Sequence, residues 1–407
     1  TPNASGADVI LTGEGADDAF GNAFTVGDFD NDGTDDLAVG AYLYNSSQGR
    51  VYIFYGDNLT TENASGADVI LTGQGTGDNF GTSLTVGKLN SGNTDDLAVG
   101  AIGYDTNDGR VYVFYGGSMA SENASGADVI ISNTGSLLGS ALASADLDDD
   151  DLDDLVIGEY GYNAQRGRVY IFYHSNITTQ SSSNADVQII CSVSLCSYGY
   201  NLEIGDLNND GISDLITNGG YFVSSIYIFY GGDIAATNVD DADVTFTGIN
   251  SLYNALDYEV NDVNNNGTDD LIVGSANQDT NSGIIYTIFG GALENSAIST
   301  SSGITINGDS ADDDFGSSLL AMDYNRDGRE DLIIGAPGYD NGGDTGRVYF
   351  YENKENFVQE LQRPTYSDGL RVDLLTGYEL KITGDTGSGF GQVLHMADLN
   401  DDGKEDL

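Results

Sequence analysis

The chain has 407 residues, of which 65 are acidic and 13 are basic, and its formal net charge is −52. This balance argues against nucleic acid as a partner, because phosphates need a basic surface, and it favours multivalent cations. Hydrophobic residues make up 39% of the chain, which is ample for a packed core, so the acidity does not indicate disorder. No apolar run approaches the roughly 18 residues that a membrane-spanning helix needs.

Short apolar segments follow one another from the N-terminus. The first covers residues 7–12, and a complete set then covers residues 67–73, 80–87, 96–101 and 109–116. These segments are rich in β-branched and aromatic residues and are bounded by Gly, Asn or Asp, which is typical of β-strands, and none sustains a helical period. The pattern therefore predicts an all-β chain in which each unit contributes about four short antiparallel strands.

An acidic decapeptide recurs between the second and third segments of each unit. The clearest copy is Asp28–Leu37, with the sequence DFDNDGTDDL. The other copies begin at Lys88, Asp146, Asp206, Asp262, Asp323 and Asp398, so that successive starts lie 56 to 75 residues apart. Seven four-stranded units of about 60 residues match the blades of a β-propeller, whose radial closure protects the sheet edges, better than an open solenoid, whose repeats are usually shorter.

The decapeptide has the composition of a cation-binding loop. Its positions 1, 3, 5 and 9 are oxygen donors, position 6 is usually Gly, and position 10 is always Leu. Glycine tolerates the positive φ that lets alternate side chains converge on one point. Ca²⁺ accepts about six to eight oxygens in flexible geometry, including a backbone carbonyl expected from position 7, whereas Mg²⁺ demands a stricter octahedron. Because no loop contains Cys or His, zinc is disfavoured, and the competing interpretation is a set of solvated acidic turns.

We therefore predict six calcium sites, in which the position 9 carboxylate is bidentate. The predicted ligands are Asp28, Asp30, Asp32, Thr34 and Asp36; Asp146, Asp148, Asp150, Leu152 and Asp154; Asp206, Asn208, Asp210, Ile212 and Asp214; Asp262, Asn264, Asn266, Thr268 and Asp270; Asp323, Asn325, Asp327, Arg329 and Asp331; and Asp398, Asn400, Asp402, Lys404 and Asp406.

The copies are not equivalent. The loops at Asp28 and Asp146 have four Asp donors each, although Asp151 replaces the Gly of the Asp146 loop and should strain its turn. The loop at Asp262 has two Asn donors and should bind more weakly. In the second copy Lys88 occupies position 1, so we expect no calcium there, and the lysine ammonium is expected to pair with Asp96.

Sequence pairs on either side of the acidic loops complete a family pattern. Phe-Gly precedes the loop at residues 20–21, 80–81, 315–316 and 390–391, and Gly335-Ala336-Pro337 follows one loop, with partial copies at residues 40–41 and 100–101. Together with Gly-Arg-Val-Tyr, this pattern resembles FG-GAP repeats, which form the seven-bladed propeller in the head of integrin α subunits. Some copies depart from it, at Leu138, Tyr198, residues 253–254 and residues 218–220.

The resemblance implies a single propeller domain over residues 1–407, with seven four-stranded antiparallel blades. It places the strand after each Phe-Gly innermost and the Ala-Asp-Val-Ile strand outermost. The strand at residues 7–12 is then expected to close the seventh blade, whose inner strand begins at Phe390 and which is incomplete at Leu407. Two explanations of the incomplete blade remain open, namely continuation of the polypeptide and donation of strands by a neighbouring subunit.

Two further features favour an extracellular location, either secreted or at the cell surface. Cys191 and Cys196, the only cysteines, are expected to form a disulfide, although a pair of free thiols is the alternative. Possible glycosylation sequons lie at Asn3, Asn45, Asn58, Asn63, Asn123, Asn176 and Asn266. A glycan on Asn266 would exclude that residue from the ligand set.

No arrangement of nucleophile and base stands out, because the only histidines are His174 and His395. We therefore expect a non-catalytic, calcium-binding adhesion or ligand-binding module, with a protein or glycan ligand on the face opposite the acidic loops. The candidate contact residues are Tyr42, Tyr44, Tyr104, Tyr160, Tyr162 and Tyr339, and packing is the alternative role for each. The alternative function is a structural subunit of an extracellular filament or coat, in which copies of the chain complete one another's blades.

Overall fold

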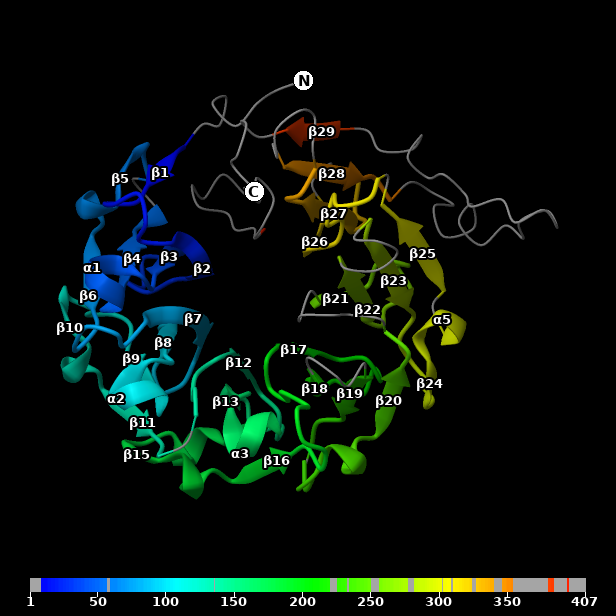
Figure 1. The fold of residues 1–407 in the computed structure, drawn as a ribbon, viewed down its shortest axis with the longest axis horizontal. Coiled ribbons are helices and arrows are strands. Elements are labelled where there is room, and N and C mark those ends of the chain that lie inside the picture. The colour runs from blue at the N-terminus through cyan, green and yellow to red at the C-terminus, as the bar shows by residue number, and fades with distance from the viewer. Residues whose placement is uncertain are drawn as a thin grey trace.

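The computed structural model describes residues 9–56, 59–134, 136–219, 225–232, 234–249, 256–276, 282–301, 303–308, 310–323, 327–339, 346–353, 380–383 and 394. Within these residues the chain is an all-β propeller of six four-stranded antiparallel blades around a central axis (Figure 1). From the inner to the outer strand, blade 1 consists of β2 (Phe20–Gly27), β3 (Asp36–Ala41), β4 (Arg50–Phe54) and β6 (Val69–Thr72), and blade 2 of β7 (Phe80–Gly87), β8 (Asp96–Ala101), β9 (Arg110–Phe114) and β11 (Val129–Ser132). In the same order, blade 3 consists of β12 (Leu142–Ala145), β13 (Asp154–Glu159), β14 (Arg168–Phe172) and β16 (Val187–Ile190), and blade 4 of β17 (Leu202–Gly205), β18 (Asp214–Gly219), β19 (Ser225–Phe229) and β20 (Val244–Thr247). Blade 5 consists of β21 (Leu256–Asn261), β22 (Asp270–Ser275), β23 (Ile284–Ile288) and β25 (Ile304–Asn307), and blade 6 of β26 (Ser318–Met322), β27 (Asp331–Ala336), β28 (Arg347–Tyr351) and β29 (Leu380–Thr383).

The expected order of strands within a blade is confirmed. Each strand that follows the Phe-Gly position is innermost, and the inner strands of consecutive blades contact one another from β2 through β26. The described residues form six blades where seven were expected. The inner strand expected from Phe390 lies outside the described residues, so the seventh blade stays a prediction.

Short elements connect the strands. The short strands are β1 (Leu11–Thr12), β5 (Glu62–Asn63), β10 (Glu122–Asn123), β15 (Gln180–Ser181) and β24 (Ser296–Ala297), and the helical turns are α1 (Tyr44–Ser47), α2 (Tyr104–Asn107), α3 (Tyr162–Gln165), α5 (Ile298–Ser301), η3 (Ala64–Gly66), η4 (Ala124–Gly126), η5 (His174–Asn176), η6 (Ser182–Asn184) and η7 (Val239–Asp241). Asn45 and Ser46 in α1 have positive φ, as do their counterparts in α2 and α3, so these three elements are tight left-handed turns.

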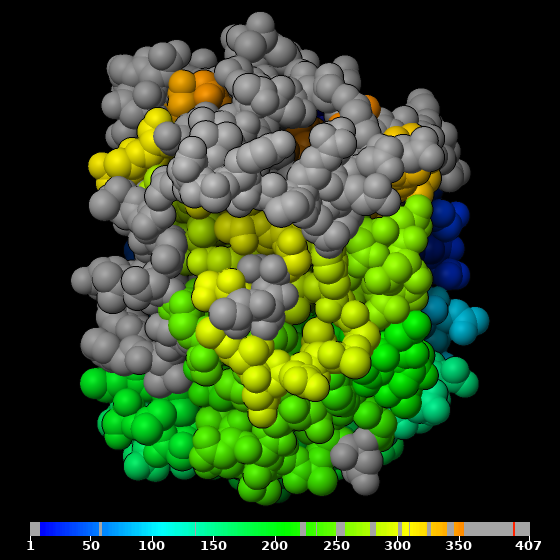
Figure 2. All heavy atoms as spheres, turned by 90° about the vertical axis from the view of Figure 1, so that its right-hand side faces the viewer, coloured from blue at the N-terminus to red at the C-terminus, as the bar shows by residue number. Residues whose placement is uncertain are grey.

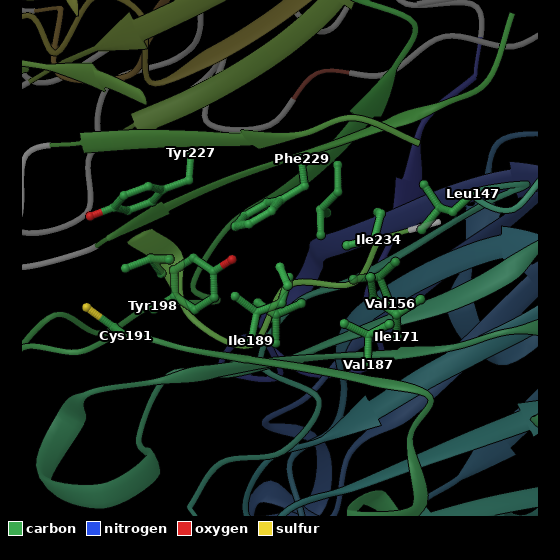
Figure 3. Packing of buried hydrophobic residues seen from close by; sticks show 14 of the residues in the cluster. Leu147, Val156, Ile171, Val187, Ile189, Cys191, Tyr198, Tyr227, Phe229 and Ile234 are labelled. Carbon is green, nitrogen blue, oxygen red and sulfur yellow. The ribbon is translucent and has the colours of Figure 1, made fainter. Parts of the chain in front are cut away.

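The core lies between blades, which explains why the strands are buried on both faces. Side chains alternate across a strand, and in β14 Val169 and Ile171 join a cluster shared with blade 4, which includes Tyr227. Tyr170 and Phe172, on the other face of the same strand, join a cluster shared with blade 2. Figure 3 shows the first cluster, in which side chains from blades 3 and 4 interdigitate. Each blade therefore depends on both of its neighbours for burial of its apolar surface.

The Phe-Gly and Gly-Ala pairs meet at the interface between blades. The Phe80 ring packs edge-on against Tyr112, with 5.5 Å between centroids, while Gly81 lies against Gly40 of blade 1. A Cβ on Gly40 would lie 2.3 Å from the carbonyl oxygen of Gly81, so only glycine permits this approach of the two backbones. The side view in Figure 2 shows the green and yellow parts of the chain packed directly against one another.

Parallel strand pairs join neighbouring blades at the outer rim. The outer strand β6 of blade 1 pairs with β10, which belongs to the connection between the third and fourth strands of blade 2. The pairs β11–β15 and β20–β24 repeat this arrangement. Strand β1 pairs with β5 in the same manner.

The expected disulfide between Cys191 and Cys196 is confirmed, and both cysteines are buried. It closes the connection that leads from blade 3 to blade 4. Among the described residues, no helix has the length and apolar character to cross a membrane.

Candidate metal centre

The acidic loops of the six described blades lie at one end of the propeller, because each joins the inner strand of its blade to the second strand. In blade 1 the loop runs from Asp28 to Asp35, between β2 and β3. Gly33 has a φ of +93° and Asn31 a φ of +64°, so the backbone curls as the glycine position predicted. The Asp28 carboxylate accepts hydrogen bonds from the Asp32 and Gly33 backbone N–H groups, at 3.0 and 3.1 Å, which holds the loop closed.

This curl brings the predicted ligands together. One carboxylate oxygen from each of Asp28, Asp30 and Asp32 lies within 4.8 Å of the other two. The Thr34 N–H donates to the Asp32 carboxylate at 2.8 Å, so position 7 lies beside position 5. A cluster that contains carboxylate oxygens only matches the preference of a hard divalent cation.

The position 9 residue has a different environment from the other three. Asp36 is 1% exposed, and its Oδ2 accepts from the Phe29 N–H at 2.9 Å while its Oδ1 accepts from the Gly56 N–H at 3.0 Å. Burial raises the pKa of Asp36 to about 7, although both hydrogen bonds lower it. Asp36 therefore connects the loop to the end of β4, a structural role that the sequence-based description of it as a bidentate ligand omitted.

The same connection recurs around the ring. In blade 3, Asp154 accepts from Leu147 N–H at 2.9 Å and His174 N–H at 2.8 Å, and in blade 4 Asp214 accepts from Leu207 and Gly231 at 2.9 and 3.0 Å. Burial raises the pKa of Asp154 and Asp214 to about 7 and that of Asp96 and Asp270 to about 6. Each oxygen retains a second lone pair, so these hydrogen bonds do not prevent coordination of a cation.

The Asp146 loop contains the second carboxylate cluster. Oxygens of Asp146, Asp148 and Asp154 lie within 4.8 Å of one another. Asp148 Oδ1 is buried and has no hydrogen-bond partner among the described residues, which is the condition expected of an atom reserved for a cation. Asp151, which replaces the usual glycine, has a φ of +67°, so the predicted strain at this turn is confirmed.

The loops with Asn at position 3 differ from these two. Asn264 directs its amide nitrogen to both oxygens of Asp270, at 2.8 and 2.7 Å, and Asn208 directs its amide nitrogen to Asp214 at 3.4 Å. In the blade 6 loop, Asp323 accepts from the Asp327 and Gly328 N–H groups at 2.9 and 2.7 Å. Asn325 and the whole loop at Asp398, including Asn400, Asp402, Lys404 and Asp406, lie outside the described residues.

The expected ion pair between Lys88 and Asp96 is wrong. Lys88 is exposed, and Asp96 is buried beneath it. Asn90 instead directs its amide nitrogen to both Asp96 oxygens at 2.7 Å, and the Gly116 N–H donates to the same carboxylate at 2.9 Å. A neutral amide satisfies the buried carboxylate without the desolvation cost of burying an ammonium group.

Position 8 was not singled out from the sequence, yet it connects adjacent loops. Asp95 Oδ2 accepts from the Asp28 N–H at 3.0 Å, Asp153 Oδ2 accepts from the Lys88 N–H at 2.7 Å, and Asp269 Oδ2 accepts from the Asp206 N–H at 3.1 Å. Each bond links position 8 of one blade to position 1 of the preceding blade. The signal was present in the sequence, because position 8 is acidic in every copy except Ser213.

Four of the candidate contact tyrosines have a structural role. The rings of Tyr44, Tyr104, Tyr162 and Tyr339 stack with Arg50, Arg110, Arg168 and Arg347, at 3.9, 3.6, 3.4 and 3.3 Å from ring centroid to guanidinium carbon. Tyr160 pairs with Tyr200 at 5.2 Å between centroids. Packing against an arginine or another tyrosine therefore accounts for five of the six candidate contact tyrosines.

Several sequon amides also take part in hydrogen bonds. Asn63 and Asn123 donate from Nδ2 to the Gly13 and Gly73 carbonyls at 2.9 Å, across the outer rim. Asn176 Nδ2 donates to the Asn184 carbonyl at 2.9 Å, and Asn45 donates to Gln48 at 2.8 Å. Asn3 and Asn58 lie outside the described residues.

A comparison with known proteins finds the same repeat pattern in a described family. A family model described as FG-GAP repeat matches residues 20–54, 138–172 and 315–351, which correspond to the first three strands of blades 1, 3 and 6 with their acidic loops. The chain therefore contains FG-GAP repeats. It is similar to integrin α subunits, being 32% identical over 234 residues to integrin alpha-5 of Xenopus laevis, with 54% of this chain and 21% of that protein covered.

Two further relatives extend the comparison. This FG-GAP propeller is 36% identical over 167 residues to integrin alpha-IIb of Homo sapiens, with 38% of this chain and 16% of that protein covered. It is 27% identical over 381 residues to phosphatidylinositol-glycan-specific phospholipase D of Mus musculus, with 81% of this chain and 42% of that protein covered. The chain thus spans less than half the length of these relatives.

Proposed function

We propose that this FG-GAP propeller is an extracellular, calcium-binding module that binds a protein or glycan ligand and has no catalytic role of its own. The convergence of Asp28, Asp30 and Asp32 oxygens within 4.8 Å carries the calcium proposal. Like charges held this close repel one another, and a divalent cation would convert that repulsion into attraction. Bound calcium would supply coordination and charge neutralisation only.

Six sites are proposed, in the loops that begin at Asp28, Asp146, Asp206, Asp262, Asp323 and Asp398. We rank the Asp28 and Asp146 loops first because their carboxylates converge. The Asp262 loop ranks last, since Asn264 already satisfies Asp270 through its amide. The position 7 backbone carbonyls of Thr34, Leu152, Ile212, Thr268, Arg329 and Lys404 remain part of the proposed ligand sets.

Calcium removal tests this proposal. Ligand bound only to the folded state stabilises it by about 2.7 kcal/mol per site at a hundredfold excess over Kd. We expect EDTA to lower the midpoint of thermal unfolding by at least about 5 °C, and excess Ca²⁺ but not equimolar Mg²⁺ to restore it. An unfolding midpoint that is the same with EDTA and with calcium would contradict calcium binding.

The proposed ligand-binding surface lies at the end of the propeller opposite the acidic loops. Of the five large hydrophobic residues that are exposed in the described part of the chain, Val193, Leu195 and Tyr200 lie in the disulfide-closed connection between blades 3 and 4. Their exposed fractions are 50%, 43% and 36%. Exposed apolar side chains on a rigid connection suit contact with a ligand surface.

A binding experiment tests this part. We expect saturable, calcium-dependent binding to members of a glycan array or an array of extracellular proteins. The double variant Val193→Ser and Leu195→Ser should lose that binding while its unfolding midpoint in calcium stays unchanged. Binding that is equally strong in the double variant would exclude this connection as the contact.

The proposal that the chain has no catalytic role is tested with the substrate class named for the phospholipase D relative. His174, the described histidine, has a buried Nδ1 without a hydrogen-bond partner among the described residues, so no hydroxyl is paired with that nitrogen. We expect no hydrolysis of a phosphatidylinositol glycan by the purified chain. Turnover of that substrate, abolished by His174→Ala, would contradict the proposal.

We also propose that the propeller is a single domain with a seventh blade, and that β1 is its outer strand. The support is the register of β1 with β5, which repeats that of β6 with β10. A bond from the Ile10 N–H to Thr61 Oγ1 at 3.0 Å likewise repeats the bond from Ile70 to Ser121 at 2.9 Å. In the alternative function, a second copy of the chain supplies strands beside β1 and builds a filament or coat.

A further inference from the structure

The loop that begins at Lys88 retains two acidic residues although we expect it to bind no cation. Asp96 fills the structural role of position 9, through its bonds to Asn90 and Gly116. Asp95 has a different partner, because its Oδ2 accepts the backbone N–H of Asp28 in blade 1 at 3.0 Å. Asp28 is the first residue of a loop whose carboxylates converge, so Asp95 contacts a neighbouring candidate site.

A second bond from blade 2 reaches the same loop. The Gly117 N–H donates to the Phe29 carbonyl at 2.7 Å, so blade 2 holds both position 1 and position 2 of the blade 1 loop. Blade 5 holds the blade 4 loop in the same two places, through Asp269 to the Asp206 N–H at 3.1 Å and the Gly291 N–H to the Leu207 carbonyl at 2.7 Å. Position 1 is the residue whose carboxylate closes the loop, so its placement controls the whole ligand set.

A glycine precedes position 1 in the three loops whose position 1 N–H is bonded to position 8 of the next blade. Gly27, Gly87 and Gly205 precede the three loops that are held by Asp95, Asp153 and Asp269. A Cβ on Gly27 would lie 2.5 Å from Val86 Cγ2 and 3.1 Å from Asp95 Oδ2. A Cβ on Gly87 would lie 2.8 Å from Ser144 Oγ and 3.0 Å from Asp153 Oδ2, so both glycines leave room for the next inner strand as well as for the incoming carboxylate.

The junction between blades 3 and 4 lacks both the glycine and the acidic residue. Here Ala145 precedes Asp146, and Ser213 stands at position 8 of blade 4. Among the described residues, no hydrogen bond connects Ser213 with the Asp146 N–H, although the Gly232 N–H still reaches the Leu147 carbonyl at 2.8 Å. The glycine and the acidic residue are therefore absent together.

We propose that Asp95 and Asp269 are positioning residues for the cation loop of the preceding blade, and that the Lys88 loop persists as a support for the Asp28 site. Each carboxylate fixes the position 1 backbone from outside the loop, so that the ligands start from a preorganised geometry. The effect on affinity rests on the proposed calcium binding, whereas the inter-blade hydrogen bond does not.

Amide hydrogen exchange, read by mass spectrometry on peptides that span residues 26–37, tests the proposal on the 407-residue chain. In EDTA, Asp95→Ala should speed exchange in these peptides relative to the unaltered chain, while Ser213→Ala should leave the peptides of the Asp146 loop unchanged. In a calcium titration, Asp95→Ala should raise the concentration that half-protects residues 26–37 on the order of fivefold, as the loss of one hydrogen bond implies.

Two further variants separate positioning from general damage. Asp95→Asn keeps an acceptor oxygen and should recover most of the protection lost in Asp95→Ala. The double variant Ala145→Gly and Ser213→Asp should build the missing bond and lower the calcium concentration needed at the Asp146 loop. Unchanged exchange of residues 26–37 in Asp95→Ala, with EDTA and with calcium, would overturn the proposal. Faster exchange in EDTA without protection by calcium in any chain would retain the inter-blade bond and refute the calcium proposal instead.

Discussion

Individual carboxylates in one loop perform two separate tasks. Asp32 is exposed and accepts a single bond from Thr34 N–H, which leaves it available for the ligand role that we propose. Asp36 is buried and accepts two backbone N–H groups, which water cannot reach if the carboxylate is removed. An unpaired buried donor costs about 1–3 kcal/mol, so the two positions should respond differently to truncation.

We predict that Asp36→Ala lowers the free energy of unfolding by about 2–4 kcal/mol even in EDTA, because two buried donors lose their acceptor. Asp32→Ala, the matched control, should cost less than about 1 kcal/mol in EDTA and should show its loss only in calcium. Chemical denaturation of both variants under both conditions measures the difference. Equal losses in EDTA would show that position 9 is a ligand without a structural role.

At the scale of elements, the inner strands of blades 4 and 5 bring acidic side chains together near the axis. Burial raises the pKa of Glu203 in β17 to about 8 and the pKa of Asp257 in β21 to about 7. The Asp257 carboxylate accepts from the Leu319 N–H of β26 at 2.7 Å, so it also joins blade 5 to blade 6. Burial and the neighbouring carboxylates raise the pKa of Glu259 well above its ordinary range.

These shifts give stability a definite dependence on pH. Between the ordinary value of 4.5 and the folded value of about 8, the folded chain holds a proton at Glu203 that the unfolded chain releases. The free energy of unfolding should therefore fall as the pH rises through this window. Glu203→Gln removes the titration, and in constant excess calcium it should lose on the order of 1 kcal/mol less than the unaltered chain between pH 5 and 8.

Urea denaturation at several pH values measures this slope, with Glu122→Gln on the exposed outer rim as the control. A slope that Glu203→Gln and Glu122→Gln leave equally unchanged would contradict a role for the inner-strand carboxyl.

For the whole molecule, we propose that closure of the ring depends on β1. Six blades are described, and β1 is held against blade 1 by its pairing with β5. Radial closure removes the exposed sheet edges that otherwise recruit other chains. The seventh position can be closed within the chain or by a second copy, and the two outcomes differ in molecular mass.

We predict that removal of residues 1–12 lowers the unfolding midpoint in calcium, because the β1–β5 pairing and the bond from Ile10 to Thr61 are lost. Light scattering after size-exclusion chromatography in calcium then distinguishes closure within the chain from closure by a second copy. A monomer before and after truncation supports closure within the chain. Assemblies that disappear on truncation support the filament alternative, and an unchanged midpoint would exclude β1 from closure altogether.

The repeat by itself predicted the all-β class and the four-stranded blades, because those depend on local pattern and on a period that recurs along the chain, and the resemblance to FG-GAP repeats supplied the strand order that the described blades confirm. The sequence also indicated the disulfide of Cys191 and Cys196. Tertiary structure alone decided the partners. Asp95 bonds to Asp28 across 67 residues of sequence, and Asn90 rather than Lys88 satisfies Asp96. Such contacts depend on which loops stand next to each other and on the cost of burying charge, and neither is written in the spacing of ligands within one loop.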